Sequence, residues 1–249
     1  MKYFVIIKIL ILISFNCFSS VKEYYIPSKA FIYGPIVYKE INRLIKDHPK
    51  KHYFYSLIEH ESCIYLLHIK CWDPTSRLKT KREEGAGLAQ LTRAYRKDGS
   101  IRFDTINNLR KEYMEELKYL TWKNVYKRPD LQIKAMILLY RKNYNYLNKV
   151  IKDEISLLAM ADAAYNGGLK GVNRDRSYCK LLKNCNKNIW FNNVEKTCTK
   201  SKKILYANKN ACDINRYHVR DVLLIRINKY LDYYNLLDLN KDYIDKKLK

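Results

Sequence analysis

The sequence predicts a mainly α-helical protein whose loops are stabilised by disulfides. Apolar residues recur at helical spacing in several segments, and no run alternates apolar and polar residues as a half-buried strand does. Only 7 glycines and 5 prolines interrupt the 249 residues. With 47% hydrophobic residues, the chain can bury one substantial core, so we expect one helical domain.

The N-terminus has the layout of a secretory signal peptide. The run from Tyr3 to Phe18 is mostly apolar, and small residues follow it. Cleavage after Ser19 would leave residues 20–249 as the mature domain. The run is short for a membrane-spanning helix, which needs roughly 20 apolar residues. We therefore expect a periplasmic or secreted protein, with an uncleaved membrane anchor as the alternative.

Four segments after the signal have apolar residues at helical spacing. They cover 36–45, about 129–145, about 153–166 and 219–231. Pro129 suits the first turn of the second segment, because a helix leaves that amide unbonded anyway. Asp153 is a suitable N-cap for the third segment, and Gly167 a suitable stop. Residues 55–63 are a further helical candidate.

The remaining segments show weaker patterns. Residues 179–212 lack helical periodicity, which predicts a loop held by disulfides. The lysine-rich tail from Lys241 is expected to fray at the C-terminus. Residues 85–90 are rich in glycine and predict a turn.

Six cysteines remain after the signal is removed, an even number that predicts disulfides in an exported protein. Short loops favour pairing neighbours along the chain, although other pairings stay open. The rival interpretation is a metal site that includes His68, but zinc sites usually show two short pairs of Cys or His ligands. The favoured pairs are Cys63 with Cys71, Cys179 with Cys185, and Cys198 with Cys212.

The formal net charge of +23 predicts an anionic partner. Basic residues are spread along the chain and no nucleic-acid recognition motif appears, so we do not expect nucleic acid to be the partner. Peptidoglycan has lactyl and peptide carboxylates and fits an exported protein better. An anionic membrane surface is the other partner that this charge permits.

Three short segments occur in one order: Glu61-Ser62, Gly85 to Gln90, and Ala164 to Gly168. In a helix over 55–63, Glu61 shares the buried side with Leu57 and Ile58. Apolar surroundings raise the pKa of a carboxyl, which would let Glu61 act as a general acid on a glycosidic oxygen.

The three segments resemble the signature of the soluble lytic transglycosylases and goose-type lysozymes. The resemblance spans about 57–175, and it is closest to phage and prophage members. Those members also share the patterns found here at 71–74, 80–85, 175–176 and 214–219. It implies a lysozyme-like fold with a catalytic core at about 50–176, followed by a C-terminal disulfide loop and helix at 177–240.

The resemblance also implies a role for each matching residue. Glu61 would be the catalytic acid, and Ser62 would hydrogen-bond toward the Gly-rich turn. Gln90 would contact sugar or orient the acid. Tyr165 would lie over Glu61, and Asn166 would bind an acetamido sugar.

The implied activity is peptidoglycan cleavage by one acid, with closure of a 1,6-anhydro ring. A hydrolytic lysozyme is the alternative, because Glu83 or Glu84 beside the turn could serve as a second carboxylate. For Glu83 the competing role is an ion pair with Arg82 or Lys79. A wall-binding protein without catalysis is a further alternative. We expect a monomer that needs no metal or organic cofactor.

Two features depart from the family pattern. The segment between Glu61 and Gln90 is longer than in short members, because it includes the loop from Cys63 to Cys71. Ala89 stands where methionine is common, which would widen a sugar subsite.

Overall fold

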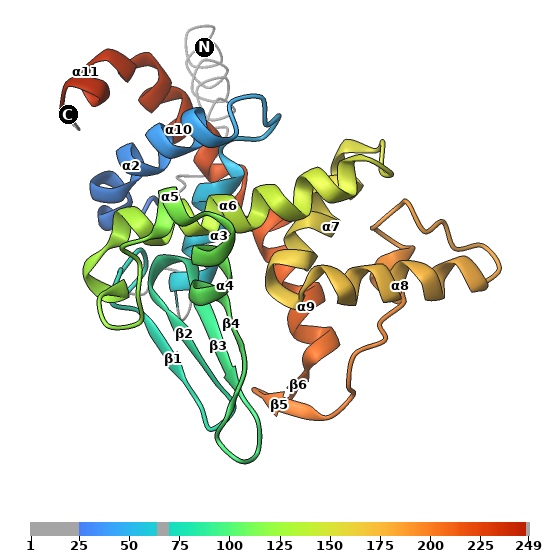
Figure 1. Cartoon of the computed structure of the whole chain (residues 1–249). Coiled ribbons are helices and arrows are strands. Elements are labelled where there is room, and N and C mark those ends of the chain that lie inside the picture. The colour runs from blue at the N-terminus through green and yellow to red at the C-terminus, as the bar shows by residue number, and fades with distance from the viewer. Residues whose placement is uncertain (1–24, 64–69, 248–249) are drawn as a thin grey trace, which may run out of the picture.

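The computed structural model describes residues 25–63 and 70–247 (Figure 1). The expected signal peptide and His68 lie outside these ranges. The described chain is mainly α-helical, as predicted, with small antiparallel sheets. Its α-helices are α2 (Ser28–Leu44), α3 (Tyr53–Ser62), α4 (Thr105–Glu112), α5 (Met114–Leu117), α6 (Pro129–Asn148), α7 (Glu154–Gly167), α8 (Leu169–Leu181), α9 (Ala211–Arg220), α10 (Lys229–Leu239) and α11 (Lys241–Lys247).

Helix α3 lies at the centre of the molecule (Figure 1). It contacts α2, α10 and the π-helical turn η4 (Asp221–Arg226). Its side chains are buried on every side: Tyr53, Phe54, Tyr55, Leu57 and Ile58 have no exposed surface. The helix therefore forms part of the core over most of its length, and its side chains become partly exposed only in its last turn, at His60 and Glu61.

A four-stranded antiparallel sheet follows α3 along the chain, in the order β1-β2-β3-β4. The sequence did not predict it, because each strand has only three to five residues and none of them alternates regularly between buried and exposed positions. The strands are β1 (Arg77–Lys79), β2 (Glu83–Ala86), β3 (Leu91–Tyr95) and β4 (Ile101–Asp104).

The predicted Gly-rich turn joins β2 to β3. It consists of the 3₁₀ turn η1 (Gly87–Ala89) and Gln90, which has a left-handed backbone with φ of 41°. Gly87 also has a positive φ, 71°, and a Cβ there would lie 2.1 Å from Oε1 of Gln132. Glycine is therefore required at position 87 by both conformation and space.

The predicted signals for α6 and α7 are confirmed. Pro129 is in the first turn of α6, which continues to Asn148, slightly beyond the expected end. The Asp153 carboxylate accepts a hydrogen bond of 2.8 Å from the Ser156 amide and so caps α7. The helix ends at Gly167, and Gly168 has a positive φ of 83°.

The C-terminal third differs from the sequence prediction in two places. Helix α8 extends through Cys179, so the expected loop starts only at Leu182 and contains the 3₁₀ turn η3 (Val194–Lys196) and the two-stranded sheet of β5 (Ile204–Tyr206) and β6 (Lys209–Asn210). The tail forms helix α11 instead of fraying, because the buried side chain of Ile244 anchors it to the core.

All three favoured cysteine pairs form disulfides. They are Cys63–Cys71, Cys179–Cys185 and Cys198–Cys212, with sequence separations of 8, 6 and 14 residues. Disulfides of this kind fit an oxidising compartment. Each bond closes a local loop, so the disulfides brace loops at the edge of the helical core.

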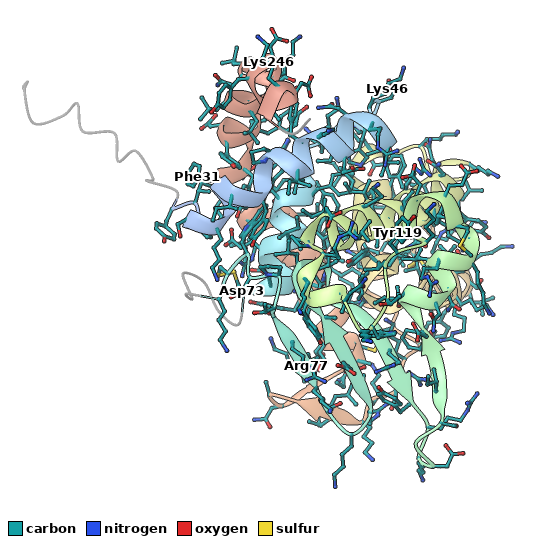
Figure 2. The ribbon with its side chains drawn as sticks, turned by 60° about the vertical axis from the view of Figure 1, so that its left-hand side comes forward. Phe31, Lys46, Asp73, Arg77, Tyr119 and Lys246 are labelled. Carbon is teal, nitrogen blue, oxygen red and sulfur yellow. A yellow bond between two sulfur atoms is a disulfide. The ribbon has the colours of Figure 1, made fainter. Side chains whose placement is uncertain are left out.

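Positive charge is distributed over several faces. Figure 2 shows Lys46 and Lys246 at one end of the molecule and Arg77 on the sheet at the other end. Within residues 25–63 and 70–247, no helix has the length and apolar character needed to cross a membrane.

The Asp153 cap of α7 leads to a prediction about the stability of the protein. We expect Asp153→Ala to lower the free energy of unfolding by about 1 kcal/mol, because the Ser156 amide loses its acceptor. Urea unfolding of the oxidised protein measures this change. Glu154→Gln is the matched control, since it removes a neighbouring first-turn acid without removing the cap. It should lower the free energy of unfolding by only a few tenths of the amount expected for Asp153→Ala. An equal loss in both variants would contradict the capping role.

Candidate active site

The three motif segments meet around the C-terminal end of α3. The hydroxyl of Tyr165, at the end of α7, donates a hydrogen bond of 2.6 Å to the carbonyl oxygen of Ala89 in the Gly-rich turn. Burial raises the pKa of Tyr165 well above its ordinary value, and the negative charges of Glu61 and Asp162 raise it further. Tyr165 thus links α7 to the turn, close enough to Glu61 and Asp162 for their charges to act on its hydroxyl.

Glu61 is partly buried, with its side chain 13% exposed. Its Oε1 lies 2.9 Å from Nε2 of His218, which comes from α9. Its Oε2 makes no hydrogen bond with any other residue that the structure describes. The carboxyl is therefore fixed through one oxygen and can offer the other to a ligand.

His218 lies between two carboxylates. Its Nδ1 is 2.7 Å from Oδ2 of Asp162, while its Nε2 faces Glu61. Both ring nitrogens face acceptors, so the arrangement is satisfied best by an imidazolium that donates from both. Burial lowers the pKa of His218, but Asp162 and Glu61 outweigh this effect and raise the pKa to about 10.

Asp162 anchors this chain of charges in the core. It has no exposed surface, and its Oδ1 accepts a hydrogen bond of 2.6 Å from the Tyr53 hydroxyl. The sequence predicted apolar surroundings for Glu61. The structure confirms the expected partial burial of Glu61, but places it at the end of a buried series of ion pairs instead of against apolar side chains alone.

A second buried network lies behind Glu61 on α3. Glu59 has no exposed surface and accepts hydrogen bonds from Arg226 at 2.7 Å and Lys229 at 2.6 Å. Nδ1 of His60 lies 2.5 Å from Oδ2 of Asp221. Burial lowers the pKa of His60, and the positive charge of nearby His218 adds to this effect, while Asp221 and Glu61 oppose it.

Ser62 and Gln90 are connected to each other only indirectly. The Ser62 hydroxyl donates to the carbonyl of Ile58 and accepts from the Trp72 amide, at 2.6 and 2.8 Å. Its carbonyl accepts from the Ser76 hydroxyl, and Nε2 of Gln90 donates to the Ser76 carbonyl at 3.3 Å. The Ser62 side chain therefore does not reach the Gly-rich turn directly, which differs from the implied role.

Gln90 folds back onto its own turn. Its Nε2 donates a hydrogen bond of 2.9 Å to the Gly87 carbonyl, and its Oε1 would lie 2.5 Å from a Cβ at Gly85. Among the described residues it makes no hydrogen bond to Glu61. In this structure Gln90 supports the shape of the turn.

Asn166 is exposed and is held through one end of its amide. Its Oδ1 accepts a hydrogen bond of 2.9 Å from Nδ2 of Asn215, which also donates to the Ala163 carbonyl. The Asn166 NH₂ group has no partner among the described residues. Its N–H groups can therefore donate hydrogen bonds to groups outside the described structure.

The two acids on β2 have different environments. Glu84 is buried and accepts from Arg77 at 2.6 Å and from Arg93 at 3.1 Å, so its charge is used within the fold. Glu83 is half-buried, and the structure describes no ion pair to either expected partner, Arg82 or Lys79. By strand alternation Glu83 shares a face with Gly85, against which Gln90 packs.

His218 and Asp162 are the site residues that sequence reasoning missed. A signal existed for each: Asp162 interrupts the apolar face of α7, and His218 lies inside the motif at 214–219. Their significance appears only when α7 and α9 lie side by side. The C-terminal segment therefore completes a site that was assigned to residues 50–176.

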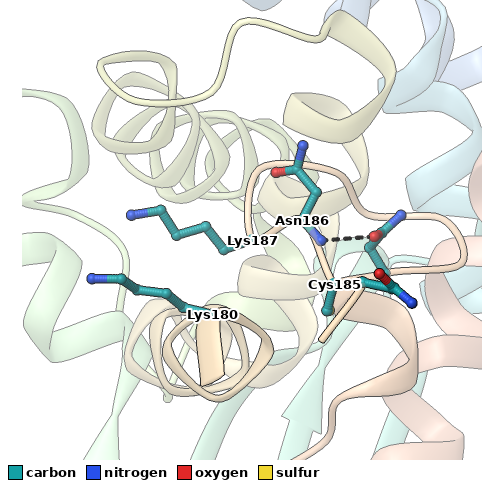
Figure 3. Close-up of a pocket in the computed structure, with 6 residues that line it drawn as sticks. Lys180, Cys185, Asn186 and Lys187 are labelled. Atoms are coloured by element: carbon teal, nitrogen blue, oxygen red, sulfur yellow. Dashed lines mark hydrogen bonds between the residues drawn. The ribbon is translucent and has the colours of Figure 1, made fainter. Parts of the chain in front are cut away.

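An open hollow beyond the end of α8 contains none of the predicted sugar-contacting residues (Figure 3). Figure 3 shows the side chains of Lys180 and Lys187 extending to the same side of it. The hollow is lined by Lys180, Asn184, Cys185, Asn186, Lys187 and Asn193.

No protein-family model, curated protein or solved structure matches this chain. Within the described ranges, no cluster of three or more His, Cys, Asp or Glu side chains is placed to hold a metal ion. The assignment of the site therefore depends on the geometry of its residues and on the motif resemblance.

The charged state of His218 leads to a prediction about how the stability of the fold depends on pH. A histidine with a raised pKa stabilises the fold fully below its unfolded value of 6.5, and this contribution is lost as pH rises through about 10. We expect His218→Gln to cost about 3 kcal/mol or more at pH 6, because Asp162 loses a buried partner. The difference from wild type should shrink steadily toward pH 10, measured by urea unfolding.

His48→Gln is the control for this series. His48 is also buried, but burial lowers its pKa to about 4, so it is neutral throughout this range. The difference in free energy of unfolding between His48→Gln and wild type should be constant between pH 6.5 and 10. A constant difference for His218→Gln as well would contradict a charged His218.

Proposed function

We propose that this chain is a peptidoglycan lytic transglycosylase with a lysozyme-like fold. It would cleave the β-1,4 bond between N-acetylmuramic acid and N-acetylglucosamine. One observation carries the proposal: Glu61 is partly buried, is fixed through Oε1 by His218, and has a free Oε2 where the three motif segments meet.

In the first step Glu61 acts as general acid. A proton on Oε2 passes to the bridging oxygen, and the bond from that oxygen to C1 of the muramic acid breaks. The acetamido oxygen of the same sugar supports the positive charge that develops at C1. Asn166 suits this step, because its free NH₂ group can bind and orient the acetamido carbonyl.

In the second step the Glu61 carboxylate acts as base. It takes the proton from the C6 hydroxyl of the muramic acid, whose oxygen attacks C1 and closes the 1,6-anhydro ring. Glu61 is thereby reprotonated by the C6 hydroxyl, its first proton having left with the leaving-group hydroxyl, and no water is consumed. The attack is intramolecular, so its effective molarity can reach the order of 10⁵ M.

His218 assists the step in which Glu61 loses its proton. The imidazolium donates to Oε1 and places a positive charge beside the carboxylate that forms. Asp162 and Tyr53 hold the imidazolium from behind and fix its orientation. His218 is thus a positioning and electrostatic residue, because it acts on the reacting atoms only through Glu61.

Hydrolysis by a lysozyme mechanism is the second candidate, because Glu83 is a carboxylate without an ion pair in the described structure. Lysozyme-type cleavage requires a second carboxylate about 5 to 9.5 Å from the acid. Glu84 is unsuitable for this role, since Arg77 and Arg93 already bind it. The products distinguish the two candidates.

Export and the partner belong to the same proposal. Three disulfides fit an oxidising compartment, where peptidoglycan is found, and the net charge of +23 favours an anionic polymer. We propose glycan strands as the partner, with an anionic membrane surface as a secondary site of attachment.

The first test is digestion of purified peptidoglycan by the oxidised mature chain and by Glu61→Gln. We expect the unmutated chain to release 1,6-anhydro muropeptides, one water lighter than hydrolytic fragments, as read by mass spectrometry. Glu61→Gln should release at least about a hundredfold less, because the amide cannot transfer the proton. Binding to the insoluble wall should persist in the variant.

Two further variants control this experiment. Glu115→Gln removes an exposed helix acid far from the motifs and should not change the rate. Glu83→Gln should also retain anhydro products. Reducing-end products that disappear in Glu83→Gln would establish the hydrolytic mechanism instead. Wall binding without any release of fragments would exclude an enzyme.

A further inference from the structure

Lys200 lies beside the end of α7, on a loop segment that is held firmly in place. The neighbouring Thr199 donates from its amide and its hydroxyl to Oδ1 of Asp175, at 2.8 and 2.7 Å. The Cys198–Cys212 disulfide ties the same segment to the start of α9. These contacts therefore fix the backbone from which the Lys200 side chain extends.

The Lys200 side chain lies against Gly167, which directly follows Asn166, and against Gly171. Its Nζ donates a hydrogen bond of 3.3 Å to the carbonyl of Gly167. A Cβ at Gly167 would lie 1.8 Å from Nζ, and one at Gly171 would lie 3.3 Å from Cε. Only glycine leaves room at position 167 for this position of the ammonium group.

The Lys200 ammonium has no carboxylate partner among the described residues. Asp175, the nearby acid, is already bound by Thr199 and by Arg216 at 2.8 Å. Burial lowers the pKa of Lys200 to about 8. Arg216 adds to the lowering, Asp175 opposes it, and Arg174 adds a smaller part. The surroundings thus hold a surplus of positive charge with two ammonium N–H donors unused.

Lys200 continues a line of site residues that begins at Glu61. His218, which binds Glu61, and Asn215, which binds Asn166, are three residues apart on α9 and so share one face of that helix. The Cβ direction of Gly167 points to both Lys200 and Asn215. The order along this face is therefore the acid, the proposed acetamide site, and the ammonium.

We propose that Lys200 binds a carboxylate on the lactyl arm of N-acetylmuramic acid. This inference rests on the proposed function and specifies its substrate class as glycan that bears carboxylates beside the cleaved bond. The acetamido and lactyl groups occupy neighbouring carbons of the sugar, so a ligand bound at Asn166 directs its lactyl arm to an adjacent position. The carboxylate is either the lactyl group itself or an acid of the attached stem peptide.

The test measures binding in a Glu61→Gln background, so that no ligand is cleaved. Three ligands are compared by calorimetry: a neutral N-acetylglucosamine oligomer, muramyl glycan without peptides, and muramyl glycan with stem peptides. We expect Lys200→Gln to weaken binding of the carboxylate-bearing glycan about tenfold, the amount that one charge-assisted hydrogen bond contributes, and to leave the neutral oligomer unaffected.

The two muramyl ligands identify the source of the carboxylate. A loss restricted to the peptide-free glycan assigns Lys200 to the lactyl carboxylate, because attachment of a stem peptide converts that carboxyl into an uncharged amide. A loss restricted to the peptide-bearing strand assigns it to a stem-peptide acid. A loss for both means that Lys200 binds whichever carboxylate the arm carries. Each of these three patterns supports the proposal.

Two variants make the experiment specific. Lys202→Gln removes the same charge from an exposed position on the same loop and should leave all three affinities within about twofold. Gly167→Ala keeps the charge but crowds both Nζ of Lys200 and Nδ2 of Asn215, so it should weaken binding of the carboxylate-bearing glycan and of the neutral oligomer. For Lys200→Gln and Lys202→Gln, unchanged binding of the neutral oligomer reports that the variant is folded.

The proposal is overturned if Lys200→Gln leaves all three affinities unchanged, or if it lowers them equally. If the proposed transglycosylase activity is absent, the experiments give a different result. In that case no anhydro products form, while the preference of Lys200 for carboxylate-bearing glycan still appears in the binding data.

Discussion

The requirement to neutralise Asp162 inside the core organises the site. An unpaired buried carboxylate costs several kcal/mol, so Asp162 needs the hydrogen bonds that Tyr53 and His218 provide. These contacts join α3, α7 and α9 around one side chain. His218 has a second ring nitrogen to satisfy, and Glu61 accepts from it. The position of the proposed catalytic acid thus follows from a constraint on the packing of the core.

Helix α3 carries two acids, Glu59 and Glu61, whose carboxylates have different surroundings. Glu59 is enclosed by Arg226, Lys229 and Tyr230, so its charge is neutralised within the fold. Glu61, two residues later, is neutralised from one side only and keeps an oxygen toward the surface. The difference in burial between these two positions of α3 therefore separates a structural carboxylate from one that is left partly free.

Sequence reasoning succeeded where the signal is local. Pro129 and Asp153 marked the starts of α6 and α7, and the short cysteine spacings favoured the three pairs that form. It failed where the information is tertiary. His218 is 157 residues from Glu61, and nothing in its own neighbourhood indicates which acids it will contact. The sheet was missed because its strands are too short for a periodic pattern to emerge.

The contact between Tyr165 and Ala89 has a consequence for how this site can vary. Tyr165 donates to the backbone carbonyl of residue 89, and every amino acid supplies that acceptor. The link between α7 and the turn therefore does not depend on the side chain at 89. The hydrogen bond would survive a change of residue there, but Ala89 is only 1% exposed, so the packing around its side chain, and not the link to Tyr165, limits which residues fit at position 89.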